Sequence, residues 1–272
     1  MLKIVELRAW GKKQIDGQEA DQLLLGLLGI DKPSQLFTWD KTLTNAEFER
    51  FSNMITERQT GKPIQYILGH WDFMGFRLEI SPDVLIPRDD TEFLVHQVFE
   101  AEEKGSKGLE IGLGSGCISI ALTMSHNIKM TGVDICPKAL AVAKSNFRRI
   151  VGVPDNFLQS NLFENLTKGE KFDFIVSNPP YIPAFDIEGL DASVKDFEPK
   201  KALDGGADGL DFYRNIVDQA KDWLVENGRI YFEIGYNQGT AVKSILQEGN
   251  FSNIKITKDL SGHDRVITAS KK

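Results

Sequence analysis

The sequence predicts an α/β fold in which a doubly wound, mostly parallel seven-stranded sheet follows a small helical domain and a β-hairpin connector. Between residues 107 and 235, apolar β-type segments alternate with helical segments such as 137–150 and 211–228, which is the pattern of βαβ units. The expected strands of this region are residues 107–112, 129–135, 156–162, 172–178 and 228–235. Residues 251–271 hold two more strands whose link is too short for a helical crossover, so one end of the sheet should be antiparallel.

The chain divides into three predicted parts. Residues 1–62 form a helical domain, because leucines recur at helical spacing in 19–30 and the segment 44–63 begins with a Thr/Asn cap and stops at a glycine and a proline. Residues 63–88, in which Gly and Pro interrupt aromatic and β-branched residues, form the hairpin connector. Residues 89–272 form the sheet domain.

The composition is that of an ordinary globular protein, with 41% hydrophobic and 26% charged residues. A net charge of -7 argues against a protein that grips a nucleic-acid backbone, because such domains carry basic surfaces. Two cysteines without CxxC pairing and four scattered histidines predict reduced thiols, a cytoplasmic location and no metal site. We expect no membrane association, because the N-terminus lacks a signal-peptide core and no apolar run approaches the roughly 18 residues of a membrane span.

A glycine-rich segment, LEIGLGSG at residues 109–116, joins the first strand of the sheet to a helix. Glycines there let the backbone turn sharply and let a ligand approach the N–H groups of the helix start. The spacing is GxGxG, whereas the GxGxxG of dinucleotide-binding folds would need a small residue where Cys117 stands. Asp134 ends the next strand, where a carboxylate can accept hydrogen bonds from both ribose hydroxyls. Together these features predict the nucleoside cofactor S-adenosylmethionine, and the absence of GxxxxGK[ST] disfavours a nucleoside triphosphate.

The segment FDFIVSNPPYIP, residues 172–183, ends an apolar strand with two prolines, which have no N–H to donate to a sheet. The strand should therefore stop at Asn178. An amide or exocyclic amine is a poor nucleophile because its lone pair is delocalised, so acceptors for both of its N–H bonds must turn it toward a methyl donor. The side-chain oxygen of Asn178 and the carbonyl of Pro179 can supply them, while Pro180 fixes the turn and Tyr181 packs against the planar group. This pattern predicts methyl transfer to nitrogen by positioning, with no obligatory general base.

Several segments together resemble the HemK/PrmC-type protein N5-glutamine methyltransferases, which modify peptide chain release factors. They are GKPIQYILGHWDF, VLIPRDDTEFLV, LEIGLGSGCISI, GVDICPKALAVAKSN, SNPPYI, EPKKALDGGADGLDFYRNI, EIGYNQG and GHDRV. The Asn-Pro-Pro-Tyr element is shared with methyltransferases that act on DNA adenine and RNA guanine, whereas the helical N-terminal part, IPRDDTE and EPKKALDGGADGL resemble this family. The resemblance implies a class I S-adenosylmethionine-dependent methyltransferase that modifies the glutamine of a Gly-Gly-Gln motif in release factors.

The resemblance also implies the residues of the site. Catalysis and substrate binding fall to Asn178, Pro179, Pro180 and Tyr181, and cofactor binding to Glu110, Gly112, Leu113, Gly114, Ser115, Gly116, Asp134, Asn161, Leu162 and Asn178, with no metal. Gly112 to Gly116 would follow the methionine end of the cofactor, with Asp134 on the ribose and Asn161 and Leu162 beside the adenine. Asn161 stands where the family has an acid. Asp89 and Asp90 replace a Pro-Glu pair in a loop over the cofactor that includes Arg88, Thr91 and Glu92.

Three other functions stay open at this point: methylation of a glutamine in a ribosomal protein, methylation of a nucleic-acid amine, and cofactor binding without turnover. The acidic balance and the lack of a basic, aromatic-rich target domain disfavour the second. We expect a monomer that binds release factors and binds neither membranes nor nucleic acid directly. Because one glutamine side chain offers few contacts, the helical domain and connector should dock the whole folded factor. Cys117, the His263–Asp264 pair, Trp71, Phe73 and the leucine stripe are interpreted as structural.

Overall fold

The computed structural model of the 272-residue chain describes residues 3–30 and 42–272. Residues 1–2 and 31–41, which the sequence assigns to the helical domain, lie outside the described residues. The chain forms two compact units, and each is described by itself. One unit comprises the residues up to His70 together with Asp191–Phe197, and the other comprises Trp71–Leu190 and Glu198–Lys272.

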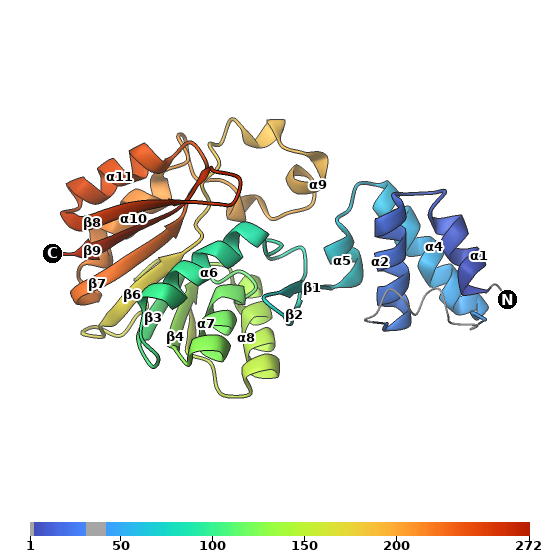
Figure 1. The fold of residues 1–272 in the computed structure, drawn as a ribbon, viewed down its shortest axis with the longest axis horizontal. Helices are drawn as coiled ribbons and strands as arrows, with labels where there is room; N and C mark the ends of the chain where they lie inside the picture. Colours follow the sequence, from blue (N-terminus) through green and yellow to red (C-terminus); the bar gives the residue numbers. More distant parts are fainter. Residues whose placement is uncertain (1–2, 31–41) are drawn as a thin grey trace. The chain divides into compact units, whose positions relative to one another are not determined.

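Helices build the smaller unit. Within its described residues these are α1 (Ile4–Gly11), α2 (Gly17–Leu28), α4 (Asn45–Gln59) and α5 (Ile64–Leu68) (Figure 1). The short α9 (Ala192–Lys195), from later in the chain, belongs to the same unit. Asp16 caps α2 through backbone N–H groups of its first turn, and Thr44 forms a capping box with Glu47 at the start of α4. Leu23 and Leu24 of α2 are fully buried, so the leucine stripe packs in a core as predicted.

A seven-stranded sheet with the strand order β5-β4-β3-β6-β7-β9-β8 is the centre of the larger unit. Its strands are β3 (Lys107–Ile111), β4 (Lys129–Asp134), β5 (Phe157–Gln159), β6 (Phe172–Ser177), β7 (Leu224–Glu233), β8 (Phe251–Lys258) and β9 (Asp264–Lys271). Strands β3 to β7 are parallel, and β9 is antiparallel to both of its neighbours, β7 and β8. This confirms the predicted doubly wound, mostly parallel sheet with one antiparallel end.

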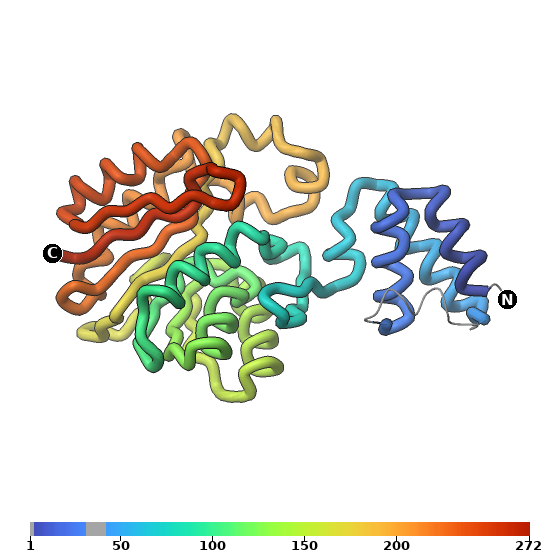
Figure 2. Tube along the Cα trace, in the orientation of Figure 1, coloured from blue at the N-terminus to red at the C-terminus, as the bar shows by residue number. Residues whose placement is uncertain are grey.

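Helices cover both faces of this sheet (Figure 1). Helices α6 (Asp89–Ala101), α7 (Cys117–His126) and α8 (Pro137–Val151) pack side by side on one face, and α10 (Asp211–Ala220) packs with α11 (Gly239–Glu248) on the other. The tube in Figure 2 shows the chain leaving β7, forming α11 and returning as the β8–β9 pair. Two short 3₁₀ turns, Ile187–Gly189 and Lys200–Ala202, lie between β6 and α10.

The connector contains the predicted hairpin. Strands β1 (His70–Phe73) and β2 (Phe76–Glu79) form a two-stranded sheet. Met74 and Gly75 join them with φ angles of 47° and 81°, as a two-residue hairpin turn requires. The buried amide of Asn146 on α8 then binds the end of β2, because its Oδ1 accepts the N–H of Glu79 at 2.7 Å and its Nδ2 donates to the carbonyl of Glu79 at 3.0 Å.

The largest errors in the predicted boundaries are at the end of β5 and at the junction of α10 with β7. Strand β5 ends at Gln159 and not at residue 162, because the chain turns at Ser160, whose hydroxyl accepts the N–H of Asn165, and Leu162 has a left-handed φ of 49°. Helix α10 ends at Ala220, although the helical pattern was expected to continue to residue 228. Tertiary pairing decides this second case, since Leu224 is buried and starts β7 opposite the first residue of β6.

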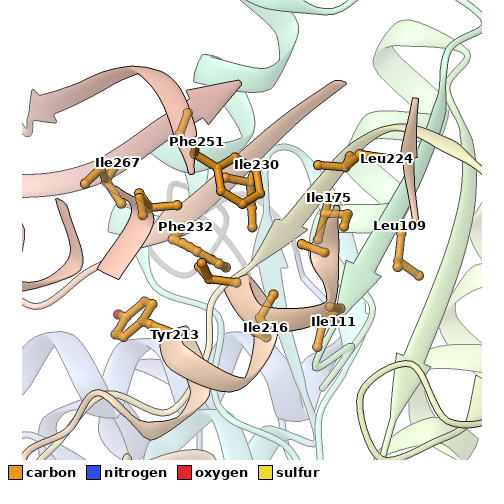
Figure 3. Packing of buried hydrophobic residues seen from close by; sticks show 14 of the residues in the cluster. Leu109, Ile111, Ile175, Tyr213, Ile216, Leu224, Ile230, Phe232, Phe251 and Ile267 are labelled. Carbon is orange, nitrogen blue, oxygen red and sulfur yellow. The ribbon is translucent and has the colours of Figure 1, made fainter. Parts of the chain in front are cut away.

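The main hydrophobic cluster fills the space between the sheet and the α10–α11 layer (Figure 3). Ile175, Ile230 and Phe232 come from adjacent strands and are completely buried there. Tyr213 of α10 packs edge-on against Phe232 with ring centroids 5.3 Å apart, and its hydroxyl donates to the carbonyl of Glu233 at 2.8 Å. The close packing of α10 and α11 against the sheet therefore holds the ends of β6 and β7 in place.

We predict that Ile230→Ala lowers the free energy of unfolding by about 2–5 kcal/mol, because it removes buried methyl groups and leaves a cavity. Urea unfolding followed by circular dichroism measures this change. The matched control is Leu260→Ala in the β8–β9 turn, where the side chain is fully exposed and the expected change is within about 0.5 kcal/mol. Equal effects of the two substitutions would contradict the assignment of the core.

Candidate active site

The predicted site residues follow the carboxyl ends of neighbouring parallel strands. The glycine-rich segment follows β3, Asp134 ends β4, and Asn178 follows β6. Strand β3 lies between β4 and β6, so the loops after all three strands leave the same edge of the sheet. The hydroxyl of Ser177, the last residue of β6, donates to the carbonyl of Ile111, the last residue of β3, at 2.6 Å. The glycine loop and the Asn-Pro-Pro-Tyr segment thus start from directly bonded strand ends.

The glycine loop contacts the carboxylate of Asp134 directly. Gly112, Gly114 and Gly116 all have left-handed φ angles of 80°, 52° and 80°, which an ordinary L-residue adopts only with strain. Asp134 accepts the N–H of Gly114 at 2.9 Å on one oxygen and the N–H of Cys136 at 2.8 Å on the other. Burial raises the pKa of Asp134, and these two hydrogen bonds oppose the shift. Each oxygen keeps a second lone pair with which it can accept from a ligand.

Glu110, next to the end of β3, carries a buried oxygen that no donor in the described part of the chain reaches. Its Oε2 accepts the N–H of Ser119 at 2.9 Å and also the hydroxyl of that residue, whereas its Oε1 has no hydrogen-bond partner among residues 3–30 and 42–272. Burial raises the pKa of Glu110 to about 8, against the hydrogen bonds from Ser119. An unpartnered acceptor in this position is costly for the free protein, and it suits a ligand that brings a donor or a positive charge.

The residues predicted beside the adenine lie next to Asp134. The N–H of Ser160 donates to the carbonyl of Asp134 at 3.0 Å, and Asn161 and Leu162 follow directly. The side chain of Leu162 packs against the hydrophobic cluster. Asn161 is exposed, and its Nδ2 donates to Oε1 of Glu164 at 2.8 Å.

The Asn-Pro-Pro-Tyr segment is held by a second glycine-rich segment, residues 203–209. The N–H of Ile182 donates to the carbonyl of Leu203 at 3.0 Å, and Nε2 of the buried Gln238 donates to the carbonyl of Tyr181 at 2.8 Å. A Cβ atom at Gly209 would lie 2.3 Å from that same carbonyl oxygen, so only glycine permits this approach. Residues 203–209 belong to EPKKALDGGADGL, and their role in holding the motif was not foreseen from the sequence.

Sequence reasoning missed Glu233, which completes a buried chain of hydrogen bonds to Asn178. Nδ2 of Asn178 donates to Oγ1 of Thr91 at 3.0 Å, and Oγ1 of Thr91 donates to Oε2 of Glu233 at 2.8 Å. Thr91 is 2% exposed and Glu233 is 1% exposed. The available signal was a single acid within the apolar strand RIYFEIG, because a buried charge without function is disfavoured.

Arg88, Asp90 and Glu92, the charged residues around Thr91, contact other residues of the same chain. The guanidinium of Arg88 forms an ion pair with the buried carboxylate of Glu198. Glu92 accepts the N–H of Met74 at 2.8 Å, and Asp90 lies 3.3 Å from the guanidinium of Arg265. Asp89 is the first residue of α6, where a negative charge is favourable at the helix N-terminus.

Three of the residues interpreted as structural, Cys117, His263 and Asp264, are either buried or bonded to neighbouring side chains. Burial raises the pKa of the Cys117 thiol to about 12, so the thiolate is disfavoured. The N–H of His263 donates to Asp259 at 3.0 Å, and Asp264 lies 3.1 Å from Lys258. Within residues 3–30 and 42–272, no three His, Cys, Asp or Glu side chains are grouped to hold a metal ion, and no helix of that region is long and apolar enough to cross a membrane.

Two family models match this sequence. The PrmC N-terminal domain matches residues 6–69, and the methyltransferase small domain matches residues 89–188. Among solved structures, a methyltransferase from Pyrococcus furiosus has a TM-score of 0.57 at 18% identity and covers 81% of this chain and 98% of its own. The 16S rRNA N2 G1207 methyltransferase of T. thermophilus, solved with AdoMet and guanosine, has a TM-score of 0.55 at 18% identity over 75% of this chain and 50% of its own. At such identities the likeness concerns the fold, which is that of methyltransferases.

Sequence relatives are much closer. The release factor glutamine methyltransferase of Fusobacterium nucleatum is 40% identical over 93% of this chain and 73% of its own length. That of Geobacter sulfurreducens is 38% identical over 92% of this chain and 87% of its own, and that of Bacillus cereus is 34% identical over 98% and 99%. With this identity over nearly the whole sequence, the chain belongs to the family of release factor glutamine methyltransferases.

Proposed function

We propose that this protein transfers the methyl group of S-adenosylmethionine to the side-chain amide nitrogen of the glutamine in the Gly-Gly-Gln motif of peptide chain release factors. The observation that carries the proposal is the position of Asn178, whose amide is held by Thr91 at the sheet edge from which the glycine loop also leaves. The side-chain oxygen of Asn178, which can accept from a substrate NH₂ group, therefore lies next to the loop that is expected to bind the nucleoside cofactor. The relatives' names supply the identity of the substrate.

The residues at the strand ends suit S-adenosylmethionine chemically. The unpartnered Oε1 of Glu110 can accept from the ammonium of the methionine end, along which Gly112, Leu113, Gly114, Ser115 and Gly116 would run. The remaining lone pairs of Asp134 can accept from the ribose hydroxyls, and Asn161 and Leu162 would flank the adenine. When bound, the cofactor supplies a methyl group on a positively charged sulfur.

Asn178, Pro179, Pro180 and Tyr181 orient the nitrogen that receives the methyl group. The Oδ1 of Asn178 and the carbonyl of Pro179 accept the two N–H bonds of the glutamine amide, which turns its nitrogen lone pair toward the methyl carbon. Tyr181 packs against the planar amide. The sulfur would leave as a neutral thioether, and the methylated nitrogen would lose one N–H proton to water. The protein therefore contributes orientation and hydrogen-bond acceptors, and no general base is required.

The helical residues 1–62 and the connector, residues 63–88, dock the folded release factor in this proposal, and residues 89–272 carry out the transfer. One glutamine side chain offers too few contacts to select a protein among many. The enzyme works as a monomer in the cytoplasm, where release factors act, and requires no metal.

The first experiment measures transfer of labelled methyl from S-adenosylmethionine to four substrates: intact release factor, a short Gly-Gly-Gln peptide, a ribosomal protein mixture and unmethylated duplex DNA. Label should appear on the Gly-Gly-Gln glutamine of the intact factor, located by mass spectrometry. The peptide should react with a lower kcat/KM because it lacks the docking contacts. Label on ribosomal protein or DNA alone would contradict the proposed substrate. Equal kcat/KM values for the peptide and the intact factor would contradict the docking role of residues 1–88.

We predict that Asn178→Ala lowers kcat by roughly 10- to 1000-fold, because it removes one acceptor of the substrate amide and allows misalignment. The dissociation constant of S-adenosylmethionine, measured by calorimetry, should change much less than kcat. Asn215→Ala on the exposed side of α10 is the matched control and should leave both quantities unchanged. Undiminished turnover by Asn178→Ala would remove this residue from the mechanism.

Cofactor binding near pH 7 should release up to about one proton per site. The Glu110 carboxyl is mostly protonated there in the free protein, because its pKa is raised to about 8, and pairing with a ligand ammonium favours the ionised form. Binding enthalpies measured in phosphate and in Tris should therefore differ, and Glu110→Gln should abolish the difference. Glu102→Gln, a buried glutamate bonded to Tyr231 and Arg229, should preserve it. A wild-type enthalpy that is the same in both buffers would contradict the pairing.

A further inference from the structure

The hydrogen bonds that hold Asn178 have a direction that follows from Glu233. An ionised carboxylate only accepts, so Thr91 must donate its single hydroxyl hydrogen across the 2.8 Å contact to Oε2 of Glu233. The Thr91 oxygen can then only accept from Asn178, so the Asn178 group 3.0 Å away must be the NH₂ end of the amide, Nδ2. The opposite end of the amide, Oδ1, is consequently directed away from Thr91.

We propose that Glu233 and Thr91 are positioning residues that set the amide orientation of Asn178, so that its Oδ1 and not its Nδ2 faces the substrate nitrogen. This role rests on the proposed methyl transfer to a glutamine amide. An asparagine amide is nearly symmetric in shape, so packing by itself does not select which end faces the substrate. The wrong orientation would place one NH₂ group against another, and the substrate would lose an acceptor.

Burial makes the arrangement sensitive to pH. Removal from water raises the pKa of Glu233 to about 7, while its side-chain hydrogen bonds with Thr91 and Tyr181 and the charge of Arg265 lower it. The other titratable groups that act on Glu233 or are acted on by it are Asp90 on α6, Tyr181 after β6, Tyr213 on α10 and Cys117 on α7. Burial also raises the pKa of Tyr181, so the phenol stays neutral, and Arg265 shares its charge with Asp90 and Asp259.

The direction of the pH effect follows from the donor count. Below about pH 7, Glu233 carries a proton. With that proton on Oε2, the oxygen that contacts Thr91, Glu233 donates to Thr91, and the Thr91 hydroxyl is released to donate to Asn178. Its partner atom would then be Oδ1, so the amide turns over and Nδ2 faces the substrate. The productive orientation is present above the pKa of Glu233 and is lost as the pH falls through it.

The first test observes Asn178 without any substrate. In protein labelled with ¹⁵N-asparagine, the side-chain NH₂ signal of Asn178 is identified by its absence from Asn178→Asp. We expect that signal to shift with a midpoint near pH 7 in the wild type and to be constant in Glu233→Gln and Thr91→Val. A wild-type signal that is constant from pH 5.5 to 9 overturns the inference, whatever the enzyme methylates.

The second test measures kcat/KM for the release factor at saturating cofactor, so that titration of Glu110 in the free protein does not enter. The wild-type value should fall about tenfold from pH 8 to pH 6 as Glu233 takes up its proton. Glu233→Gln should change less than about twofold over this range, because a glutamine oxygen can accept from Thr91 at either pH. An acid limb that survives in Glu233→Gln assigns the titration to another group and overturns the proposal.

Conservative and distant variants separate positioning from general damage. Thr91→Ser keeps the hydroxyl and should retain the wild-type pH profile, whereas Thr91→Val, of similar volume, should lose about 10- to 100-fold in kcat with unchanged cofactor affinity. Glu102→Gln is the buried-glutamate control and should keep the acid limb. Similar losses in Thr91→Ser and Thr91→Val would mean that Thr91 acts through packing. If the Asn178 signal shifts with pH as expected but the enzyme does not methylate the release factor, the proposed function is refuted and the inferred amide orientation still holds.

Discussion

The parallel pairing of β3 with β6 is the constraint on which the rest of the site depends. It places the glycine loop and the Asn-Pro-Pro-Tyr segment next to each other, although Gly112 and Asn178 are far apart in the sequence. The hydroxyl of Ser177 secures the two strand ends through the carbonyl of Ile111. Both strands are completely buried near these ends, and helices cover both faces of the sheet, so the edge is rigid. Transfer by positioning needs such rigidity, because it has no strong chemical group to compensate for poor alignment.

A second constraint is the close approach of two backbones. Cβ atoms at Gly205 and Gly209 would lie only 2.8 Å and 2.3 Å from the carbonyl oxygens of Pro180 and Tyr181, so the two segments can approach this closely only with glycine at both positions. Gln238 then spans both segments, donating to the carbonyls of Tyr181 and Gly209. The turn imposed by the prolines is thereby fixed in space as well as in its dihedral angles. If the Asn-Pro-Pro-Tyr turn could move relative to the sheet, the carbonyl of Pro179 would not point in one defined direction, even with fixed dihedral angles.

The third feature is the set of carboxylates buried at the strand ends. Glu110 and Glu233 have pKa values raised to about 8 and about 7, chiefly by burial. A raised pKa means that the folded protein binds the proton more tightly than the unfolded chain does, so ionising these groups lowers the free energy of unfolding. Residues that destabilise the free protein in this way are retained where a ligand or a reacting group uses them. In this unit they lie on either side of β6, one near the glycine loop and one behind Asn178.

Much of the fold was predictable because it rests on local patterns. Alternating strands and helices, the GxGxG turn and the double proline each act within a few residues, and they were sufficient for the parallel sheet, its antiparallel end and the segments that flank the site. The end of α10 was not predictable, since Trp223 and Leu224 suit a helix locally. Their backbone pairing with Phe172, the first residue of β6, instead makes them part of the sheet.

The sequence by itself determined which chemical groups are present at the site: the glycines, Asp134, and the Asn178 amide beside two prolines. Only the tertiary structure decided how Asn178 is oriented, because Thr91 and Glu233 belong to a helix and a strand that are far from Asn178 in the sequence and meet it through packing. Their significance lies in burial and in the direction of hydrogen bonds. Neither property belongs to a residue type or a spacing, since both arise only when water has been excluded and the partners have been brought within about 3 Å.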